Sequence, residues 1–160
     1  MNLNVILNDI IIIDGHADIP EDVYLREIRG EENPFHKHYQ QLKNAGLNIV
    51  FTSIFTKGSK ENCLIQGLLE VERMLKIAEE YEDIVIIRSK KDLDYVLESK
   101  KLGFVLSLEG FEPLYGHLEL LDMYYRLGVR AAMLTWNKEN PFAHGSEVAN
   151  GGLTELGFKA

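Results

Sequence analysis

Residues 48–56 read NIVFTSIFT, and this stretch decides the fold class. It is almost continuously apolar and rich in β-branched and aromatic side chains, a composition typical of a strand buried on both faces of a parallel sheet. Runs of the same kind occur before and after it, at residues 10–14, 84–88, 104–108 and 129–135. The sequence therefore predicts five parallel strands.

Segments of helical character separate these strands, and we expect helices at residues 34–45, 61–82, 90–99 and 117–127. The pair Asn33-Pro34 suits the N-cap and first turn of the first helix, and Gly46 is a suitable stop signal after it. The second helix repeats apolar side chains every three or four positions, which gives it one buried stripe. Strands that alternate with helices predict an α/β fold with right-handed crossovers.

Two α/β architectures fit this alternation, an open doubly wound sheet and a (β/α)8 barrel. The chain contains neither G-x-G-x-x-G after the first strand nor G-x-x-x-x-G-K-[ST], so the nucleotide-binding open sheet loses its main support. Polar residues instead follow several strands, where a barrel places its active site. A complete barrel needs about 250 residues. We therefore expect the N-terminal, five-stranded part of a (β/α)8 barrel of TIM type, apparently truncated, in one incomplete domain over residues 1–160.

Composition and charge exclude several classes of protein. The chain has 17 Lys and Arg against 25 Asp and Glu, a net charge of −8, so it lacks the basic charge of a nucleic-acid binder or an anionic-membrane binder. Its one cysteine, Cys63, excludes an internal disulfide framework. Residues 5–13 lack the basic segment and cleavage site of a signal peptide. We expect a cytoplasmic protein without a nucleic-acid or membrane partner.

The first candidate strand leads into the pentapeptide DGHAD at residues 14–18. Residues two apart in an extended backbone point to the same side, so His16 and Asp18 can present an imidazole and a carboxylate to one point. Zinc accepts both kinds of ligand. The alternative is a turn in which Asp14 and Gly15 shape the backbone and the side chains are solvated, and an H-x-D pair alone does not decide between the two.

Glu109 directly follows the apolar run at residues 104–108. An acid at that place in a barrel lies low in the barrel mouth, where an unpaired carboxylate is costly and needs a cation. The two oxygens of such a glutamate can bridge two metal ions about 3.5–4 Å apart. The alternative is a strand-end residue that faces solvent.

The fifth candidate strand leads into Trp136 and Asn137. Trp136 is the only tryptophan of the chain, and at a strand end it can form a wall of a substrate pocket, with Asn137 orienting the indole or a substrate. The alternative is that Trp136 belongs to the core.

Together these segments resemble the membrane (renal) dipeptidase family of zinc peptidases, a branch of the metal-dependent amidohydrolase barrels. The resemblance rests on ordered segments, namely DGHAD at 14–18, LEG at 108–110, LTWN at 134–137, NPFAHG at 140–145 and GGLTELG at 151–157. Order and spacing agree from about residue 10 to residue 158. One departure is His144, which stands where the family has the aspartate of an A-D-G triplet.

The resemblance implies a dipeptidase that uses two zinc ions and a hydroxide bridging them to hydrolyse dipeptides, often with a D-residue at the C-terminal position. It implies that His16 and Asp18 bind one zinc and that Glu109 bridges this zinc to the second. Trp136 stands where mammalian members carry a substrate-contacting histidine. The resemblance implies no further catalytic residue within this segment.

The family completes its second zinc site with two histidines, and it handles substrate and proton transfer with an arginine and an aspartate, all from later strands that this sequence does not include. His36 and His38 lie two apart on one expected helix and diverge, so they are poor replacements. His117 is expected at the surface. His144, in a loop at the active-site end, is the remaining candidate for a replacement ligand.

Five strands cannot close a barrel, so we expect open edges at the first and fifth strands and an uncovered apolar face. The chain is then expected to form a homo-oligomer or to bind a complementing C-terminal half, and to be inactive as a dipeptidase without it. Two alternatives remain open. One is another binuclear amidohydrolase, although those enzymes more often carry H-x-H after the first strand, and the other is a non-catalytic truncated barrel that acts as an assembly module.

Overall fold

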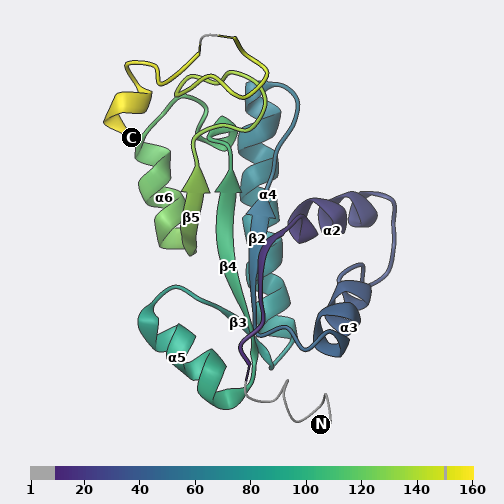
Figure 1. Ribbon diagram of the computed structural model, residues 1–160. Coiled ribbons are helices and arrows are strands. Elements are labelled where there is room, and N and C mark those ends of the chain that lie inside the picture. The colour runs from purple at the N-terminus through teal and green to yellow at the C-terminus, as the bar shows by residue number, and fades with distance from the viewer. Residues whose placement is uncertain (1–9, 150) are drawn as a thin grey trace.

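The computed structural model describes residues 10–149 and 151–160, and it contains one parallel sheet of five strands (Figure 1). The central strands β2 (Ile49–Ile54) and β4 (Leu102–Glu109) pair with each other along the whole of β2. β1 (Ile13–Ala17) pairs with the other side of β2. β3 (Ile84–Ile86) pairs with the first residues of β4 and β5 (Val129–Met133) with its last ones, so both lie on the side of β4 away from β2.

The first strand lies later in the chain than the predicted residues 10–14, and Asn48 explains the shift. Its Oδ1 accepts a hydrogen bond from the Ile12 N–H at 2.8 Å, and its own N–H donates to the Ile12 carbonyl at 3.0 Å. The Asn48 side chain therefore takes the place of a backbone acceptor for the Ile12 N–H, and regular strand pairing begins at Ile13. The consequence is that His16 lies within β1 rather than after it.

Four helices lie at the predicted segments, α3 (His36–Asn44), α4 (Lys60–Glu80), α5 (Lys90–Ser99) and α6 (Glu119–Leu127). The helix α3 starts later than residue 34, because Asn33 adopts a left-handed φ of 48° and Phe35 takes the N-cap position. A further helix, α2 (Ile19–Ile28), is not expected from the hydrophobic pattern. Two short 3₁₀ helices follow β4 and end the chain, η1 (Glu112–Leu114) and η2 (Gly157–Lys159).

The sheet has a different cover on each face. Phe104, Leu106 and Leu108 of β4 are fully buried and belong to the main core, which also contains Val71 and Met74 of α4. The alternate side chains of β4 point to the opposite face. There a smaller core forms with α5, which lies at the lower, N-terminal end of the strands in Figure 1. Glu109, the last residue of β4, lies on this second face at its upper end.

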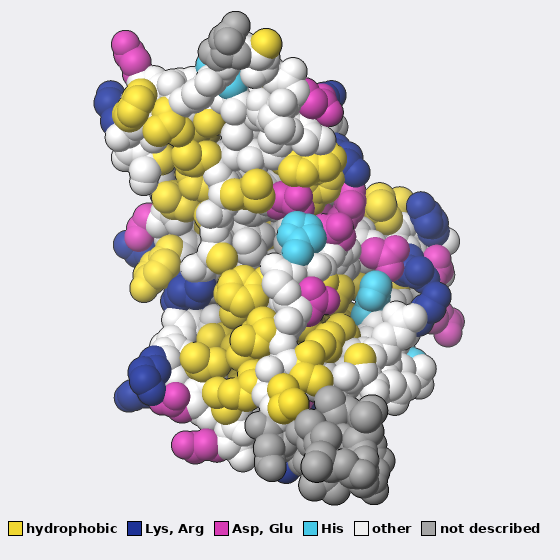
Figure 2. Space-filling view, viewed as in Figure 1, with side chains coloured by type: hydrophobic (Ala, Val, Ile, Leu, Met, Phe, Trp, Pro, Cys, Tyr) yellow, Lys and Arg dark blue, Asp and Glu magenta, His cyan; other side chains and the backbone are white. Residues whose placement is uncertain are grey.

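Apolar side chains remain exposed along the sheet, as expected for strands that do not close into a barrel. Ile13 of β1 is 53% exposed and Met133 of β5 is 45% exposed. Figure 2 shows apolar side chains gathered over the lower part of the sheet in this view. No helix within residues 10–149 and 151–160 combines the length and the apolar composition that a bilayer crossing needs.

Glu70 of α4 is an acid in the main core, with none of its surface exposed. Its Oε2 accepts a hydrogen bond from the Phe55 N–H at 3.1 Å and its Oε1 accepts one from Gln66 Nε2 at 2.7 Å. Burial raises the pKa of Glu70 from 4.5 to about 8, the two hydrogen bonds oppose this shift, and the charges of Glu21 and Asp18 add to it. The folded protein therefore holds a proton that the unfolded chain releases at lower pH.

This raised pKa makes stability depend on pH in a defined direction. The contribution of Glu70 is fully present below pH 4.5 and is lost as the pH rises through about 8, a loss on the order of 3–5 kcal/mol. Glu70→Gln keeps the shape of the side chain but cannot ionise. We expect urea unfolding at about pH 5 and about pH 9 to show a larger loss of stability for the wild type than for Glu70→Gln. An equal loss in the two proteins would contradict the assignment.

Candidate metal centre

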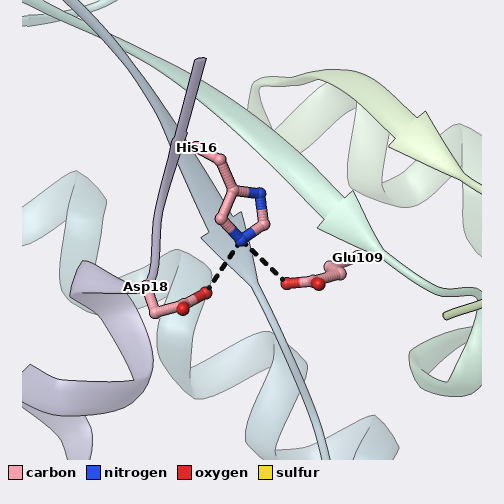
Figure 3. Close-up of side chains that lie close together, drawn as sticks. All are labelled: His16, Asp18 and Glu109. Atoms are coloured by element: carbon pink, nitrogen blue, oxygen red, sulfur yellow. Dashed lines mark ion pairs between the residues drawn. The ribbon is translucent and has the colours of Figure 1, made fainter. Parts of the chain in front are cut away.

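Three side chains that sequence reasoning proposes as metal ligands converge at the carboxyl end of the sheet (Figure 3). His16 comes from β1 and Glu109 is the last residue of β4, so the two lie on strands that flank β2 on opposite sides. Two strand spacings correspond to about 9–10 Å. Imidazole and glutamate side chains together span that gap, and Ser53 of β2, between them, is small enough to leave the space above it open.

A β-bulge in β1 aims the first two ligands. The pairing with β2 shifts register between Asp14 and Ala17, and Asp14 Oδ1 accepts a hydrogen bond from the His16 N–H at 3.1 Å. Asp18 lies beyond the strand, at the N-cap position of α2 with φ −81° and ψ 44°. Simple strand alternation therefore identifies the right pair of residues but not the reason for their convergence, since the bulge and the start of α2 set their directions.

The three ligand atoms have the spacing of a metal site. His16 Nε2 lies 3.3 Å from Asp18 Oδ1 and 3.3 Å from Glu109 Oε2, and each of the three residues offers one ligand atom within 4.8 Å of the other two. A tetrahedral zinc site with bonds of about 2.0–2.1 Å separates neighbouring ligand atoms by about 3.3–3.4 Å. One imidazole and two carboxylates also match the ligand chemistry of zinc. The group thus fits a divalent cation such as zinc.

The exposure of the three side chains supports the same conclusion. His16 and Asp18 are 55% and 56% exposed, whereas the Glu109 side chain is 11% exposed. A half-open site gives a cation a path from solvent. The nearly buried Glu109 carboxylate has most to gain from a cation, because burial penalises an uncompensated negative charge.

Ser53 is a site residue that sequence reasoning missed. Its hydroxyl donates a hydrogen bond to Glu109 Oε2 at 2.7 Å, and its residue surface is 2% exposed. Next to it, the Thr52 hydroxyl contacts the Ala17 carbonyl at 3.4 Å and ties β1 to β2. The available signal was the single serine among the three hydroxyl residues of the run 48–56, but only the three-dimensional structure shows that Ser53 bonds to Glu109.

The strand-end loops form a cavity of about 420 Å³ whose lining includes Phe55, Lys57, Trp136 and Asn137. Trp136 is 46% exposed and its ring lies 4.9 Å from that of Phe55 at 80°, so it is not a core residue. Asn137 Oδ1 accepts a hydrogen bond from the Ser146 hydroxyl at 2.9 Å, which orders the following loop. The lining includes none of the three ligands, but Phe55 follows Ser53 by two residues and Glu112, also in the lining, follows Glu109 by three.

Glu112 of η1 also lines this cavity. Burial raises the pKa of Glu112 and the negative charge of Glu109 adds to the shift, while a hydrogen bond from Asn140 Nδ2 at 3.2 Å opposes it. Glu109 at the end of β4 and Glu112 of η1 are thus two acids close enough for their charges to repel. A cation at the three-ligand group reduces the repulsion between them.

The other histidines take no part in the three-ligand group within the described residues. His36 is exposed, and His38 Nε2 lies 2.6 Å from Asp22 Oδ2. The His117 ring stacks on Tyr115 with centroids 6.0 Å apart. His144 Nδ1 contacts the Gly152 carbonyl at 3.0 Å and its Nε2 lies 3.8 Å from Glu139 Oε2, so the structure does not bring this candidate replacement ligand into the three-ligand group.

The contact between Ser53 and Glu109 is directly testable. Ser53→Ala removes the hydroxyl but leaves every ligand in place. We expect the affinity for Zn²⁺ to fall about 10-fold or more, as is typical when a ligand loses the partner that orients it. Isothermal titration of the folded chain with Zn²⁺ measures the change, with Ser107→Ala on the neighbouring strand as the control. Wild-type affinity in Ser53→Ala would show that Glu109 does not need this hydrogen bond.

Comparisons with known proteins show which family the chain resembles. A family model described as membrane dipeptidase, peptidase family M19, matches residues 1–160. An uncharacterized protein of Acinetobacter calcoaceticus is 29% identical over 134 residues, covering 82% of this chain and 42% of its own length. An uncharacterized dipeptidase of Schizosaccharomyces pombe is 26% identical over 171 residues, covering 93% of this chain and 41% of its own.

Solved structures show the same fold. A metallopeptidase of Rhodobacter sphaeroides, liganded with a phosphinate mimic of the dipeptide L-Ala-D-Ala, superposes with a TM-score of 0.78 at 18% identity, covering 94% of this chain and 54% of its own. The chain spans less than half the length of these curated relatives and about half of that structure. It therefore has the α/β fold of about half of such an enzyme. Because the family model matches along its whole length, the chain belongs to the membrane dipeptidase family, peptidase family M19.

Proposed function

We propose that this chain supplies the zinc-binding half of a dipeptidase active site. The observation that carries the proposal is the convergence of His16 Nε2, Asp18 Oδ1 and Glu109 Oε2 at zinc-ligand spacing. Family membership supports it, since relatives of this family are named dipeptidases. A bound zinc ion supplies a Lewis acid for the peptide carbonyl and lowers the pKa of water at the site.

The residues of this chain have distinct tasks in that site. His16 offers the lone pair of Nε2 and must be neutral to bind a cation. Asp18 brings one negative charge from the start of α2. Glu109 holds Oε2 toward His16 and Ser53, and its carboxylate can serve two cations through its two oxygens. Trp136 and Asn137 are proposed to line the side of the pocket that receives the substrate.

The proposed substrate is a dipeptide, and a C-terminal D-residue fits the ligand of the Rhodobacter sphaeroides structure. Because the chain covers about half of such relatives, the remaining metal ligands and the groups that bind the substrate are proposed to come from a complementing C-terminal half. The open edges at β1 and at β5 are where that half, or a second copy of this chain, is proposed to pair. A cytoplasmic location stays a prediction.

Two measurements test the proposal. The chain alone is titrated with Zn²⁺, and hydrolysis of L-Ala-D-Ala is assayed with and without the C-terminal half of a family member of known structure. We expect the chain alone to bind Zn²⁺, and hydrolysis to appear only in the complemented protein. His16→Ala and Glu109→Gln should remove both, because the first takes away the imidazole ligand and the second takes away the negative charge and one oxygen of the carboxylate.

His144→Ala is the matched control, because it removes a histidine outside the three-ligand group. We expect it to retain Zn²⁺ binding. The proposal fails if the double variant His16→Ala/Glu109→Gln binds Zn²⁺ as well as the wild type does. The dipeptidase assignment fails separately if the complemented protein loads with metal and leaves L-Ala-D-Ala intact.

A further inference from the structure

The backbone of Phe55 is held by side chains rather than by a neighbouring strand. Phe55 directly follows the last residue of β2, where the ladder with β4 ends. Its N–H donates to Glu70 Oε2 at 3.1 Å, and its carbonyl accepts from Gln66 Nε2 at 3.1 Å. Gln66 Nε2 also donates to Glu70 Oε1 at 2.7 Å, which links the two side chains. We call Gln66 and Glu70 the α4 clamp.

The sequence spacing and the burial of the α4 clamp explain its rigidity. Residues four apart on a helix lie on the same face, so Gln66 and Glu70 approach Phe55 together. Glu70 has no exposed surface and Phe55 is 9% exposed. Hydrogen bonds in such a dry place are costly to break without replacement, because water does not reach the freed groups. The α4 clamp therefore fixes the path of the chain as it leaves β2.

The helix that carries the α4 clamp is itself fixed to the segment that follows Glu109. Gly67 lies one residue after Gln66, and a Cβ atom at this position would come within 2.7 Å of Tyr124 Oη and 2.8 Å of Pro113 Cβ. Pro113 belongs to η1, which begins shortly after the metal ligand Glu109. Close packing at Gly67 thus ties α4 to the end of β4, while the α4 clamp ties it to the end of β2.

Phe55 forms one wall of the strand-end cavity that Trp136 and Asn137 also line. Its ring packs edge-on against Trp136 at 4.9 Å, and Lys57 Nζ lies 4.6 Å from the Phe55 ring centroid. Ser53, two residues earlier, bonds to Glu109. A shift of the Phe55 backbone would move this aromatic wall relative to the metal ligands, because the ligands belong to β1, to the start of α2 and to β4.

We propose that Gln66 and Glu70 are positioning residues that set the Phe55–Trp136 wall, and that this wall selects the apolar side chain of the substrate dipeptide. The choice of a dipeptide as substrate rests on the proposed dipeptidase function. The positioning of the Phe55–Trp136 wall by the α4 clamp does not depend on that function. The α4 clamp then has a role in substrate selection rather than in metal binding. Loss of the clamp then weakens substrate binding and leaves the chemistry at the metal unchanged.

The first test uses Trp136, the only tryptophan of the chain, as a probe that needs no activity. We expect Gln66→Leu and Glu70→Leu to raise acrylamide quenching of Trp136 fluorescence about twofold, since the indole loses its packing partner. Glu70→Gln keeps an acceptor for the Phe55 N–H and should stay near the wild type. Gln41→Leu, an exposed glutamine of α3, is the matched control. Circular dichroism verifies folding, and if Glu70→Leu fails to fold, the half-buried Gln66→Leu carries the test.

The second test is kinetic and uses the complemented protein. We expect Gln66→Leu to raise KM for Leu-D-Ala roughly tenfold, to change KM for Gly-D-Ala little, and to leave kcat and Zn²⁺ affinity within about twofold. Unchanged quenching in the clamp variants overturns the inference, and so does an equal loss of kcat on both dipeptides. If the wild type hydrolyses no dipeptide, the dipeptidase proposal fails while the quenching result still decides whether the clamp sets the wall.

Discussion

β2 lies between β1 and β4, and this position brings the three candidate ligands together. Parallel pairing on both sides of β2 puts the carboxyl ends of three strands at one edge of the sheet. His16 and Glu109 can meet at 3.3 Å only because a single strand separates their backbones and because that strand carries the small Ser53 beneath them. Every chemical statement about the metal centre follows from this arrangement.

A second constraint comes from helix α4, which contacts both strand ends. Its Glu70 and Gln66 hold the chain after β2, and its Gly67 packs on the segment after β4. A buried acid is costly, and burial raises the pKa of Glu70 to about 8. The fold tolerates this cost because the Glu70 carboxyl group accepts a hydrogen bond from the Phe55 N–H, which has no partner on a neighbouring strand. Helix α4 thus contacts the cavity wall through Gln66 and Glu70, and it contacts the segment after Glu109 through Gly67.

Local pattern predicts much of this fold, because buried parallel strands such as residues 104–108 are near-continuous apolar runs. It also predicts Glu109 as a ligand candidate, since an acid directly after such a strand lies at the active-site end. The bulge between Asp14 and Ala17 and the hydrogen bond from Ser53 to Glu109, 56 residues apart, lie outside local pattern. They depend on which strands become neighbours, and a single sequence carries no period that encodes such pairings.

Whether His16, Asp18 and Glu109 share one cation can be seen in a crystal structure of the chain grown with Zn²⁺. Anomalous scattering at the zinc edge locates the ion independently of the protein density. We expect an anomalous peak about 2.0–2.2 Å from His16 Nε2 and from one carboxylate oxygen each of Asp18 and Glu109. A zinc-loaded crystal whose peaks all lie elsewhere, for example at His38 or His144, would contradict this expectation.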